Sequence, residues 1–384
     1  MKILLIHTYY TIRGGEDVVF EQEGHLLSQD NEVETLALYN KSGIKGFFQF
    51  LFSIWNIFSA RKLEKKIKQF TPELVHFHNL HFAGGPLLIR VVKKSGIPIV
   101  MTLHNYRLLC PSAILLHNAK IFTDSLRSNF PWKAIKYRVY RNSYAQTFWL
   151  AFVNWFHKRI GTWRSVNTFI MLTEFAKKRF IDSSFDLSKD KFAVKPNFIT
   201  NENIQEKMER NDDFLFIGRL SEEKGIDILL KTFENSKFKV KIVGDGPLAE
   251  QVKTYCQRNS NIQYLGRLPY SQIAALLQKC SVLLFPSIWY EGMPMTIIEA
   301  FSTSTPVICS NLGAMSEMII DGHNGLFFEV GSIRSLQEKM DEWAKKTDDE
   351  KKQMRKNAYA AYKSKYTPEI NKIQLERIYR SVCK

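Results

Sequence analysis

The chain has 384 residues, 45% of them hydrophobic and 24% charged, which are the proportions of a globular protein long enough for two domains. Lysine and arginine exceed aspartate and glutamate by 54 − 38 = 16, so the surface is basic and favours anionic partners: nucleic acid, phosphates or an anionic membrane. The five cysteines form no C-x-x-C pair, and the opening apolar run is too short for a signal peptide. No apolar stretch reaches the ~18 residues of a spanning helix. We therefore expect a cytoplasmic protein, soluble or peripheral.

Short apolar runs alternate with helical patterns through the first half of the chain. The runs KILLIH (2–7), ELVHFHN (73–79) and IPIVMTLHN (97–105) predict strands, and EDVVFEQEGHLLS (16–28) predicts a helix after a glycine turn. Strands alternating with helices indicate a parallel sheet covered on both faces, so residues 1–197 are predicted to form a Rossmann-like domain.

The same pattern restarts in the second half. A helix is predicted at GIDILLKTF (225–233), and strands are predicted at DFLFIGRL (213–220), FKVKIVGDG (238–246), NIQYLG (261–266), SVLLFPS (281–287) and PVICSN (306–311). The polar segment 194–212 marks the boundary, and we expect a second Rossmann-like domain over 198–365. Residues 366–384 predict a helix with a Thr-Pro start.

The fold class expected is therefore α/β, with two Rossmann-like domains facing across a cleft. Ligands of open parallel sheets bind beyond the carboxyl ends of the strands, so polar residues at those ends are the candidates for a site.

The segment EGMPMTIIEA (291–300) places two acids around a helix start. Pro294 suits a first helical turn, and the free N–H groups of Met295 and Thr296 can hold a phosphate. Glu291 precedes the helix and Glu299 lies in its second turn, roughly 7 Å further along the axis. Both carboxylates suit sugar hydroxyls, although a helix cap and a solvated acid are equally compatible with this segment alone.

Two cations follow the first predicted strand of the second half. Arg219 and Lys224, in GRLSEEKG, are a guanidinium and an ammonium of the kind that clamp a diphosphate. Taken singly they would be surface charges, but their occurrence with the acids in one domain favours a site. Gly244 and Gly246 are interpreted as ordinary turn glycines.

Four motifs in order, GRLSEEKG, VGDGP, YLGRLP and E-x7-E, resemble the retaining family 4 glycosyltransferases of group 1, which have the glycosyltransferase-B fold. YYTIRGGED, VHFHNLHFAGG and TLHNYRLLCP resemble the branch that builds bacterial surface polysaccharides. The resemblance covers nearly the whole chain. It implies that 1–197 is an acceptor-binding domain, that 198–365 is a nucleotide-sugar-binding domain, and that the helix of 366–384 crosses back to the first domain.

The resemblance implies roles for individual residues. Arg219 and Lys224 would bind the diphosphate of a UDP- or GDP-sugar, Glu299 the ribose and Glu291 the donor sugar. The full donor set expected is Gly14, Gly15, Gly218, Arg219, Lys224, Arg267, Glu291, Gly292, Met293, Met295, Thr296 and Glu299, with Arg267 against the nucleobase. The groups expected to act in catalysis are His104, Arg219, Lys224 and Glu291.

The amino-terminal half supplies glycines and histidines at predicted strand ends. The pair Gly14 and Gly15 is typical of a turn, and here it also suits close approach to a phosphate or sugar. By resemblance, His104 contacts the donor sugar near the reacting carbon, and Asn105 stands where many relatives have aspartate. His78 and Asn105 are expected on the acceptor side.

A metal site is not expected, because no carboxylate or cysteine accompanies the histidines of 76–81 at ligand spacing. The resemblance likewise implies retention of configuration without a metal ion or other cofactor, with the nucleotide-sugar as a substrate. The leaving diphosphate would be stabilised electrostatically and could take the proton of the acceptor.

A basic aromatic stretch runs from 125 to 173 without an acidic residue, and KGFFQFLFSIWNIFSARK (45–62) is apolar on nearly all sides. An anionic membrane, an ordinary core with a solvated face, and nucleic acid are the three interpretations, and the lipid-linked acceptors of the family favour the membrane. We therefore predict a transferase peripheral on the inner face of the cell membrane, acting on a lipid-linked glycan and binding no nucleic acid. A nucleotide-sugar epimerase and a non-enzymatic basic membrane-binding protein are the alternatives.

Overall fold

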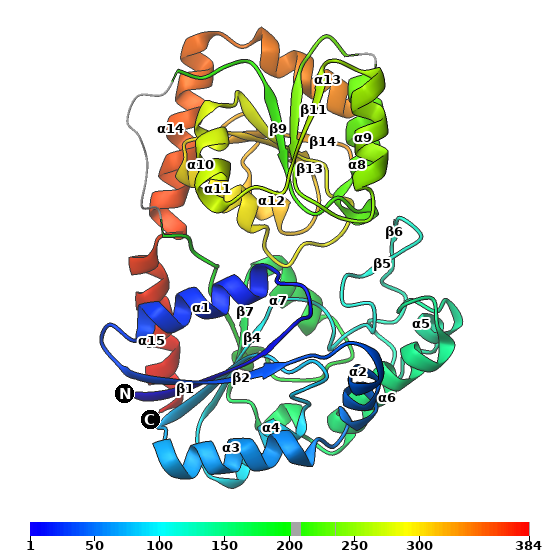
Figure 1. Ribbon diagram of the computed structural model, residues 1–384. Helices are drawn as coiled ribbons and strands as arrows, with labels where there is room; N and C mark the ends of the chain where they lie inside the picture. Colours follow the sequence, from blue (N-terminus) through cyan, green and yellow to red (C-terminus); the bar gives the residue numbers. More distant parts are fainter. Residues whose placement is uncertain (201–208, 235, 384) are drawn as a thin grey trace. The chain divides into compact units, whose positions relative to one another are not determined.

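The computed structural model describes residues 1–200, 209–234 and 236–383, so residues 201–208 of the predicted boundary segment lie outside the described part. The chain forms two compact units, each with one six-stranded sheet (Figure 1). Residues 1–117, 122–197 and 368–384 make up the first unit, and residues 118–121 and 198–367 the second.

The first unit contains a parallel sheet with the strand order β2-β1-β3-β4-β7-β8. Its strands are β1 (Lys2–Tyr9), β2 (Glu32–Tyr39), β3 (Leu74–Asn79), β4 (Ile99–Leu103), β7 (Thr168–Met171) and β8 (Phe192–Val194). Its helices are α1 (Gly15–Leu27), α2 (Gly43–Phe52), α3 (Ile57–Phe70), α4 (Leu87–Lys94), α5 (Trp132–Lys136), α6 (Tyr144–Arg159), α7 (Glu174–Ile181) and α15 (Pro368–Val382). Two short strands, β5 (Leu116–His117) and β6 (Lys120–Ile121), lie outside the main sheets.

Helices cover both faces of this sheet, as its continuous apolar strands require. Leu5 and Ile170 pack against α1 and α15, to which Phe20 and Leu375 contribute. The helices α3 and α4 lie on the opposite face (Figure 1). The carboxyl-terminal helix begins at Pro368 and belongs to the first unit.

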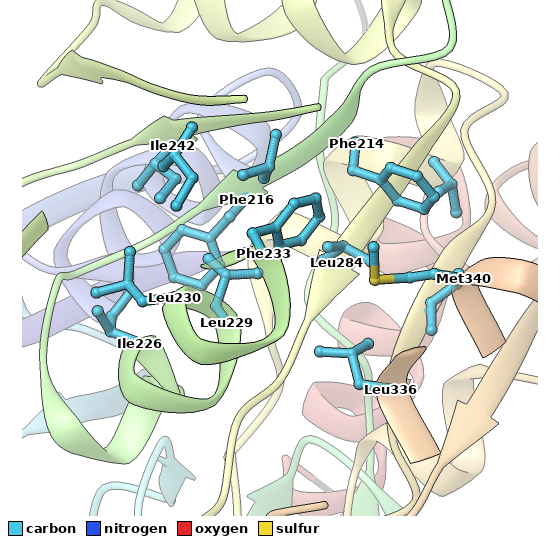
Figure 2. Packing of buried hydrophobic residues seen from close by; sticks show 14 of the residues in the cluster. Phe214, Phe216, Ile226, Leu229, Leu230, Phe233, Ile242, Leu284, Leu336 and Met340 are labelled. Carbon is cyan, nitrogen blue, oxygen red and sulfur yellow. The ribbon is translucent and has the colours of Figure 1, made fainter. Parts of the chain in front are cut away.

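The second unit has the strand order β11-β10-β9-β12-β13-β14. Its strands are β9 (Phe214–Ile217), β10 (Val240–Val243), β11 (Ile262–Gly266), β12 (Val282–Phe285), β13 (Val307–Ser310) and β14 (Gly325–Phe328). Its helices are α8 (Ile226–Glu234), α9 (Ala249–Arg258), α10 (Tyr270–Lys279), α11 (Met295–Ser302), α12 (Met315–Met318), α13 (Ile333–Lys345) and α14 (Asp348–Lys365). Figure 2 shows Phe233 of α8 and Met340 of α13 packed against the strand residues Phe214 and Leu284.

The α/β class with two parallel sheets is confirmed, and so are the strands predicted from apolar runs. The sequence interpretation did not name β2, β7, β8 and β14. The strands β2 and β8 lie at the two edges of their sheet and have one buried residue each, so neither carries a run of buried apolar residues. The strands β7 and β14 have four residues, the same length as the predicted β9 and β12.

Each sheet has one point at which the chain reverses its direction of strand addition. In the first unit this switch lies between β1 and β3, and in the second between β9 and β12. Loops that leave the carboxyl ends of two strands at such a switch diverge, and the space between them is where ligands bind in open α/β sheets. The candidate residues lie at these two places.

Candidate active site

At the switch point of the second unit, a lysine from the loop after β9 meets an acid from the loop after β12. Lys224 Nζ lies 2.6 Å from Glu291 Oε1, and Glu291 is only 5% exposed. The Lys224 ammonium also lies over the rings of Phe285 and Trp289, at 5.4 and 5.5 Å from their centroids. The fold thus joins two residues that are 67 positions apart in the sequence.

Glu291 Oε1 accepts three hydrogen bonds. Besides Lys224, Ser287 Oγ donates at 2.7 Å and Trp289 Nε1 at 2.9 Å. Among the described residues no donor reaches Oε2. A carboxylate oxygen fixed in this way leaves the second oxygen, which has its own lone pairs, to accept hydrogen bonds from a ligand.

Close packing between the two loops fixes this geometry. Gly225 has a φ of +73°, and a Cβ there would lie 2.0 Å from the carbonyl oxygen of Pro286. The carbonyl oxygen of Glu223 accepts a hydrogen bond from Ile288 N at 3.0 Å and lies 3.1 Å from Ser287 Oγ, whose one proton is donated to Glu291. The last residues of GRLSEEKG therefore set the distance between Lys224 and Glu291.

Arg219 lies on the same loop, but its side chain is 65% exposed and forms an ion pair with Glu223. Its Nε also lies 3.3 Å from Ser221 Oγ. The structure therefore brings Lys224 and Glu291 into contact and leaves the guanidinium of Arg219 at the surface of the loop.

The helix α11 begins at Met295, with Pro294 as its N-cap. The backbone N–H groups of Met295 and Thr296 belong to the first turn, where an α-helix has no internal acceptor for them. Glu299, one turn later, is half-buried, and burial raises the pKa of its carboxyl from 4.5 to about 7. No hydrogen bond or ion pair of this carboxyl occurs among the described residues. Gly292 and Met293 lie in the connection between Glu291 and this helix.

The turn after β10 packs on the end of β9. Gly244 has a φ of +141°, and a Cβ there would lie 1.8 Å from the carbonyl oxygen of Gly218. The glycines of VGDGP are thus required by a close approach of two backbones, a contact that the interpretation as ordinary turn glycines did not include. Arg267 follows β11 and is exposed.

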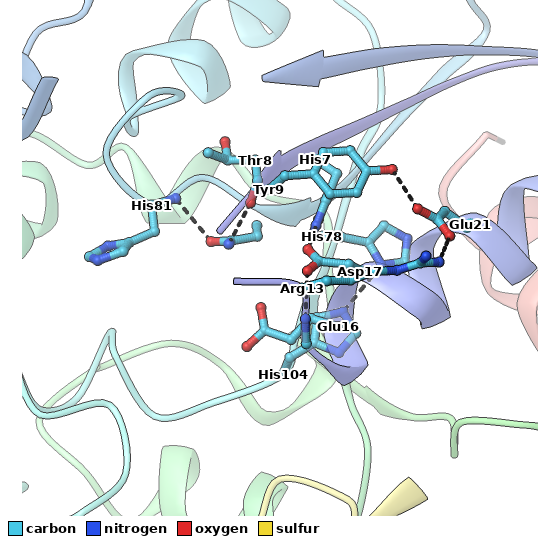
Figure 3. Close-up of polar contacts among 12 residues, drawn as sticks. His7, Thr8, Tyr9, Arg13, Glu16, Asp17, Glu21, His78, His81 and His104 are labelled. Atoms are coloured by element: carbon cyan, nitrogen blue, oxygen red, sulfur yellow. Dashed lines mark hydrogen bonds and ion pairs between the residues drawn. The ribbon is translucent and has the colours of Figure 1, made fainter. Parts of the chain in front are cut away.

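In the first unit, Gly14 caps α1 and Gly15 is its first residue. Gly14 N donates to Asp17 Oδ2 at 2.8 Å, and the other oxygen of Asp17 lies 2.7 Å from His7 Nε2 (Figure 3). A Cβ at Gly14 would meet no atom within 4 Å, so the space in front of this turn is open. The loop is held from behind by a buried polar pair and has room in front for a ligand.

The predicted acceptor and sugar-binding residues meet at the ends of β3 and β4. His78 Nδ1 lies 3.2 Å from His104 Nε2 (Figure 3), and Asn105 Nδ2 donates to Glu16 Oε1 at 2.9 Å. His78 is 3% exposed, whereas His104 is half-buried. Burial lowers the pKa of His104 to about 3 and raises that of Glu16 above its ordinary value.

A cavity of about 80 Å³ within the first unit adjoins these residues. Its polar lining includes His78, His104, Asn105, Arg107 and Asn154, and its apolar lining includes Leu80, Phe82, Met101, Leu150 and Trp163. Polar groups at strand ends beside an apolar wall are the usual make-up of a site for an amphipathic ligand.

The fold brings Glu23 to the histidines of β3, which the sequence spacing does not reveal. Ligand atoms of Glu23, His76 and His78 lie within 4.8 Å of one another. However, Lys195 forms an ion pair with Glu23, and the ring nitrogens of His76 contact Tyr379 OH at 2.7 Å and Thr102 Oγ1 at 2.8 Å. A buried ammonium on the carboxylate opposes a second cation there, so the residues present do not fit a metal site, and the absence of a metal stays a prediction.

Two family models cover the chain one after the other. Residues 13–202 match Glycosyltransferase Family 4, and residues 197–361 match Glycosyl transferases group 1. The chain belongs to the group 1 glycosyltransferases. The resemblance seen in the motifs is confirmed, and the two matched regions coincide closely with the two sheets.

Relatives of this glycosyltransferase include an uncharacterized glycosyltransferase of Methanocaldococcus jannaschii, 27% identical over 88% of this chain and 87% of the relative. The O-antigen chain mannosyltransferase C of Escherichia coli is 30% identical over 42% of this chain and 48% of its own. Among solved structures, the crystal structure of HepE from Anabaena in complex with UDP superposes with a TM-score of 0.68 at 15% identity, covering 99% of this chain and 100% of that one. The chain therefore has the glycosyltransferase-B fold.

Four residues of the candidate site were missed in the sequence. Ser287 and Trp289 precede Glu291 by four and two positions in PSIWYEG, so a search for donors beside the acid could have found them. Glu23 and Lys195 lie 172 residues apart, and no local pattern links them.

Proposed function

We propose that the protein is a metal-independent, retaining hexosyltransferase that moves a sugar from a UDP- or GDP-sugar to a lipid-linked glycan in bacterial polysaccharide synthesis. The observation that carries the proposal is the arrangement at the β9/β12 switch, where Glu291 is held through one oxygen by Lys224, Ser287 and Trp289. Support for the nucleotide comes from the HepE complex, whose ligand is UDP, and support for the pathway class from the O-antigen mannosyltransferase.

In this proposal the charges at the switch point act on the leaving group. Lys224, Arg219 and the N–H groups at the start of α11 stabilise the diphosphate as negative charge develops on it. Glu291 Oε2 accepts hydrogen bonds from hydroxyls of the donor sugar, and Glu299 accepts them from the ribose.

The transfer exchanges one bond for another at the anomeric carbon. The bond from this carbon to the diphosphate oxygen breaks, and a bond to the acceptor oxygen forms on the same face. The departing phosphate oxygen takes the proton of the acceptor hydroxyl, so no further base is needed. Sugar-binding groups, His104 among them, orient the reacting carbon.

The membrane part of the proposal rests on α2 and its connection to α3. The helix α2 contains no buried residue, and the exposed large apolar side chains of this region are Ile44, Phe47, Phe48, Phe52, Trp55, Ile57 and Phe58. Residues 35–63 include Lys41, Lys45, Arg61 and Lys62 but no acid. Aromatic side chains flanked by cations favour insertion between anionic headgroups.

A groove of about 570 Å³ beside α2 supports the same proposal, because it combines Phe48, Phe52 and Phe58 with Lys41, Lys45 and Lys62. The stretch 125–173 is of mixed character. Trp163 is 3% exposed and belongs to the core, whereas Trp132 is 66% exposed. No helix among the described residues is long and apolar enough to cross a bilayer. We therefore assign the membrane contact to residues 43–58.

The first experiment measures thermal unfolding with UDP, GDP, ADP and their sugars, for the wild type and Glu299→Ala. Saturation at a hundredfold over Kd adds about 2.7 kcal/mol of stability. We expect a shift with one nucleotide that is lost in the variant. If the stabilisation persists unchanged in Glu299→Ala, Glu299 is not part of the donor site. A second experiment tests for sugar transfer by incubating the protein and the sugar nucleotide that it binds with membrane glycolipid.

A further inference from the structure

A row of polar side chains leads from the interior of the first unit to His104. Lys195 Nζ forms an ion pair with Glu23, and Glu23 Oε2 lies 3.4 Å from His78 Nε2. His78 Nδ1 lies 3.2 Å from His104 Nε2. The side chains of Lys195, Glu23 and His78 are buried, whereas His104 is half-buried and borders the cavity.

The chemistry of this row determines where its protons lie. Burial lowers the pKa of His78 well below its usual value and that of His104 to about 3, so both rings are neutral at pH 7. Neither His78 Nε2 nor Glu23 Oε2 has a hydrogen-bond partner among the described residues, and the 3.4 Å between these two atoms is an electrostatic contact outside hydrogen-bond geometry. A lone pair on Nε2 would face the lone pairs of the carboxylate oxygen, whereas an N–H would be attracted to that oxygen, so Glu23 favours His78 with its proton on Nε2.

The tautomer of His78 then dictates that of His104. With its proton on Nε2, His78 has a lone pair on Nδ1, so the hydrogen bond between the rings is donated by His104 Nε2. A neutral imidazole has one N–H, and His104 Nδ1 is therefore left with a lone pair. No hydrogen bond to this nitrogen occurs within the described ranges.

We propose that Lys195, Glu23 and His78 are positioning residues that hold His104 as an acceptor, with Nδ1 free to receive a hydrogen bond from a sugar hydroxyl. The inference rests on the proposed glycosyl transfer, in which His104 binds sugar. A histidine in the other tautomer would present an N–H to the same hydroxyl, and the hydroxyl would have to turn its own proton elsewhere. His78 thereby acts through His104, which differs from the direct acceptor contact expected from the sequence.

The tautomers are measured directly in the full chain labelled with ¹⁵N-histidine, by long-range ¹H–¹⁵N spectra at pH 7 without ligand. The His78 and His104 signals are assigned by their loss in His78→Asn and His104→Asn. We expect the Nε2–H form for both. An Nδ1–H form or an imidazolium at His104 in the wild type would overturn the proposal.

His157 is a reference within the same spectrum. Its Nε2 lies 2.7 Å from the carbonyl oxygen of Ile54, which can only accept, and its Nδ1 lies 2.9 Å from Thr162 Oγ1. His157 is therefore expected in the Nε2–H form in every variant, because nothing in its surroundings is changed.

Two double variants test the origin of the tautomer, and both remove the buried charges together so that neither is left unpaired. In Glu23→Met with Lys195→Met, His78 Nε2 loses its acceptor, and we expect both His78 and His104 to change to the Nδ1–H form. In Glu23→Gln with Lys195→Met, the amide oxygen can accept from His78 Nε2, so the wild-type tautomers should return. If the Met/Met variant folds and keeps the wild-type tautomers, the role of Glu23 is refuted. If the Met/Met variant does not fold, the Gln/Met variant decides: loss of the wild-type tautomer there refutes the role of Glu23.

The functional readout is the rate of nucleotide release from the UDP- or GDP-sugar that raises the unfolding temperature most. In the Met/Met variant we expect kcat to fall about tenfold or more with KM changed less than about twofold, and the Gln/Met variant to recover. A wild-type kcat with reversed tautomers would overturn the positioning role while the proposed function stands. If nucleotide release also survives Glu291→Gln and Lys224→Met, the proposed function itself fails, whatever the tautomers are.

Discussion

The raised pKa of Glu299 predicts how donor binding depends on pH. The carboxyl is half-buried and has no partner among the described residues, and burial raises its pKa to about 7. In the proposed donor site, ribose hydroxyls would donate hydrogen bonds to Glu299 and so favour its ionised form. Binding of a nucleotide sugar would then require loss of the proton, and we expect affinity to rise with pH until Glu299 is ionised in the free protein.

The size of the effect follows from the pKa. At pH 6, one unit below a pKa of 7, about one molecule in eleven carries ionised Glu299, and the apparent affinity falls about tenfold, or about 1.4 kcal/mol. Above pH 8 nearly all molecules are ionised, so Kd should become constant.

The assay is isothermal titration calorimetry between pH 5.5 and 8.5 with the nucleotide sugar selected by thermal unfolding. A sugar nucleotide is used because its esterified diphosphate, unlike that of UDP or GDP, does not titrate in this range. The control is Glu299→Gln, which keeps the size and polarity of the side chain but cannot ionise. We expect its Kd to be independent of pH. A wild-type Kd that is constant from pH 5.5 to 8.5, or an equal slope in Glu299→Gln, would refute the reasoning.

Three further predictions concern the charged site and the membrane. Lys224→Met should weaken donor binding by about 2–5 kcal/mol, as expected for a desolvated charge pair. Lys231→Met, on the exposed side of α8, is the control and should not weaken it. If titration calorimetry gives the same Kd for Lys224→Met and the wild type, Lys224 is not part of the site. Trp289→Phe deletes one of the three hydrogen-bond donors to Glu291. We expect kcat/KM to fall by the equivalent of about 1.5–3 kcal/mol, while UDP or GDP alone binds as before. Weaker binding of UDP or GDP would contradict the assignment of Glu291 to the donor sugar. Phe47→Ser with Phe52→Ser should reduce sedimentation with anionic vesicles, and sedimentation equal to that of the wild type would exclude α2 as the contact.

Ile333→Ser provides the matched control for the membrane experiment. Ile333 is an exposed apolar residue of α13, at 39% exposure, and belongs to the second unit. Its replacement removes exposed apolar surface outside residues 43–58 and should leave vesicle binding unchanged.

Local sequence determined much of the fold. The run KILLIH has four consecutive apolar residues from Ile3 to Ile6, and SVLLFPS has four from Val282 to Phe285; all are buried, as a doubly covered parallel strand requires, and both runs are strands. The helix after Pro294 begins where proline and the following apolar spacing predict it. The edge strands β2 and β8 were not named because each buries only one residue and so shows no apolar run.

The candidate residues of the donor site were also legible in the sequence, because each lies within a short motif. Lys224, Glu291 and Glu299 could be selected from residue type and from position after a strand. What each one contacts was not legible. Arg219 and Lys224 look equivalent in GRLSEEKG, yet only Lys224 reaches Glu291, whereas Arg219 pairs with Glu223.

The sequence by itself determined the alternation of strands with helices, the family and the candidate acids and cations of the site, because these depend on patterns within about ten residues. Only the tertiary structure decided that one oxygen of Glu291 is occupied and the other open, and that Glu23 and Lys195 stand behind His78. The physical reason is that hydrogen-bond and ion-pair partners are set by distances of a few ångströms between strand ends. Parallel strands joined by helices bring together residues that are 67 or 172 positions apart, and no local pattern in the chain records which of them meet.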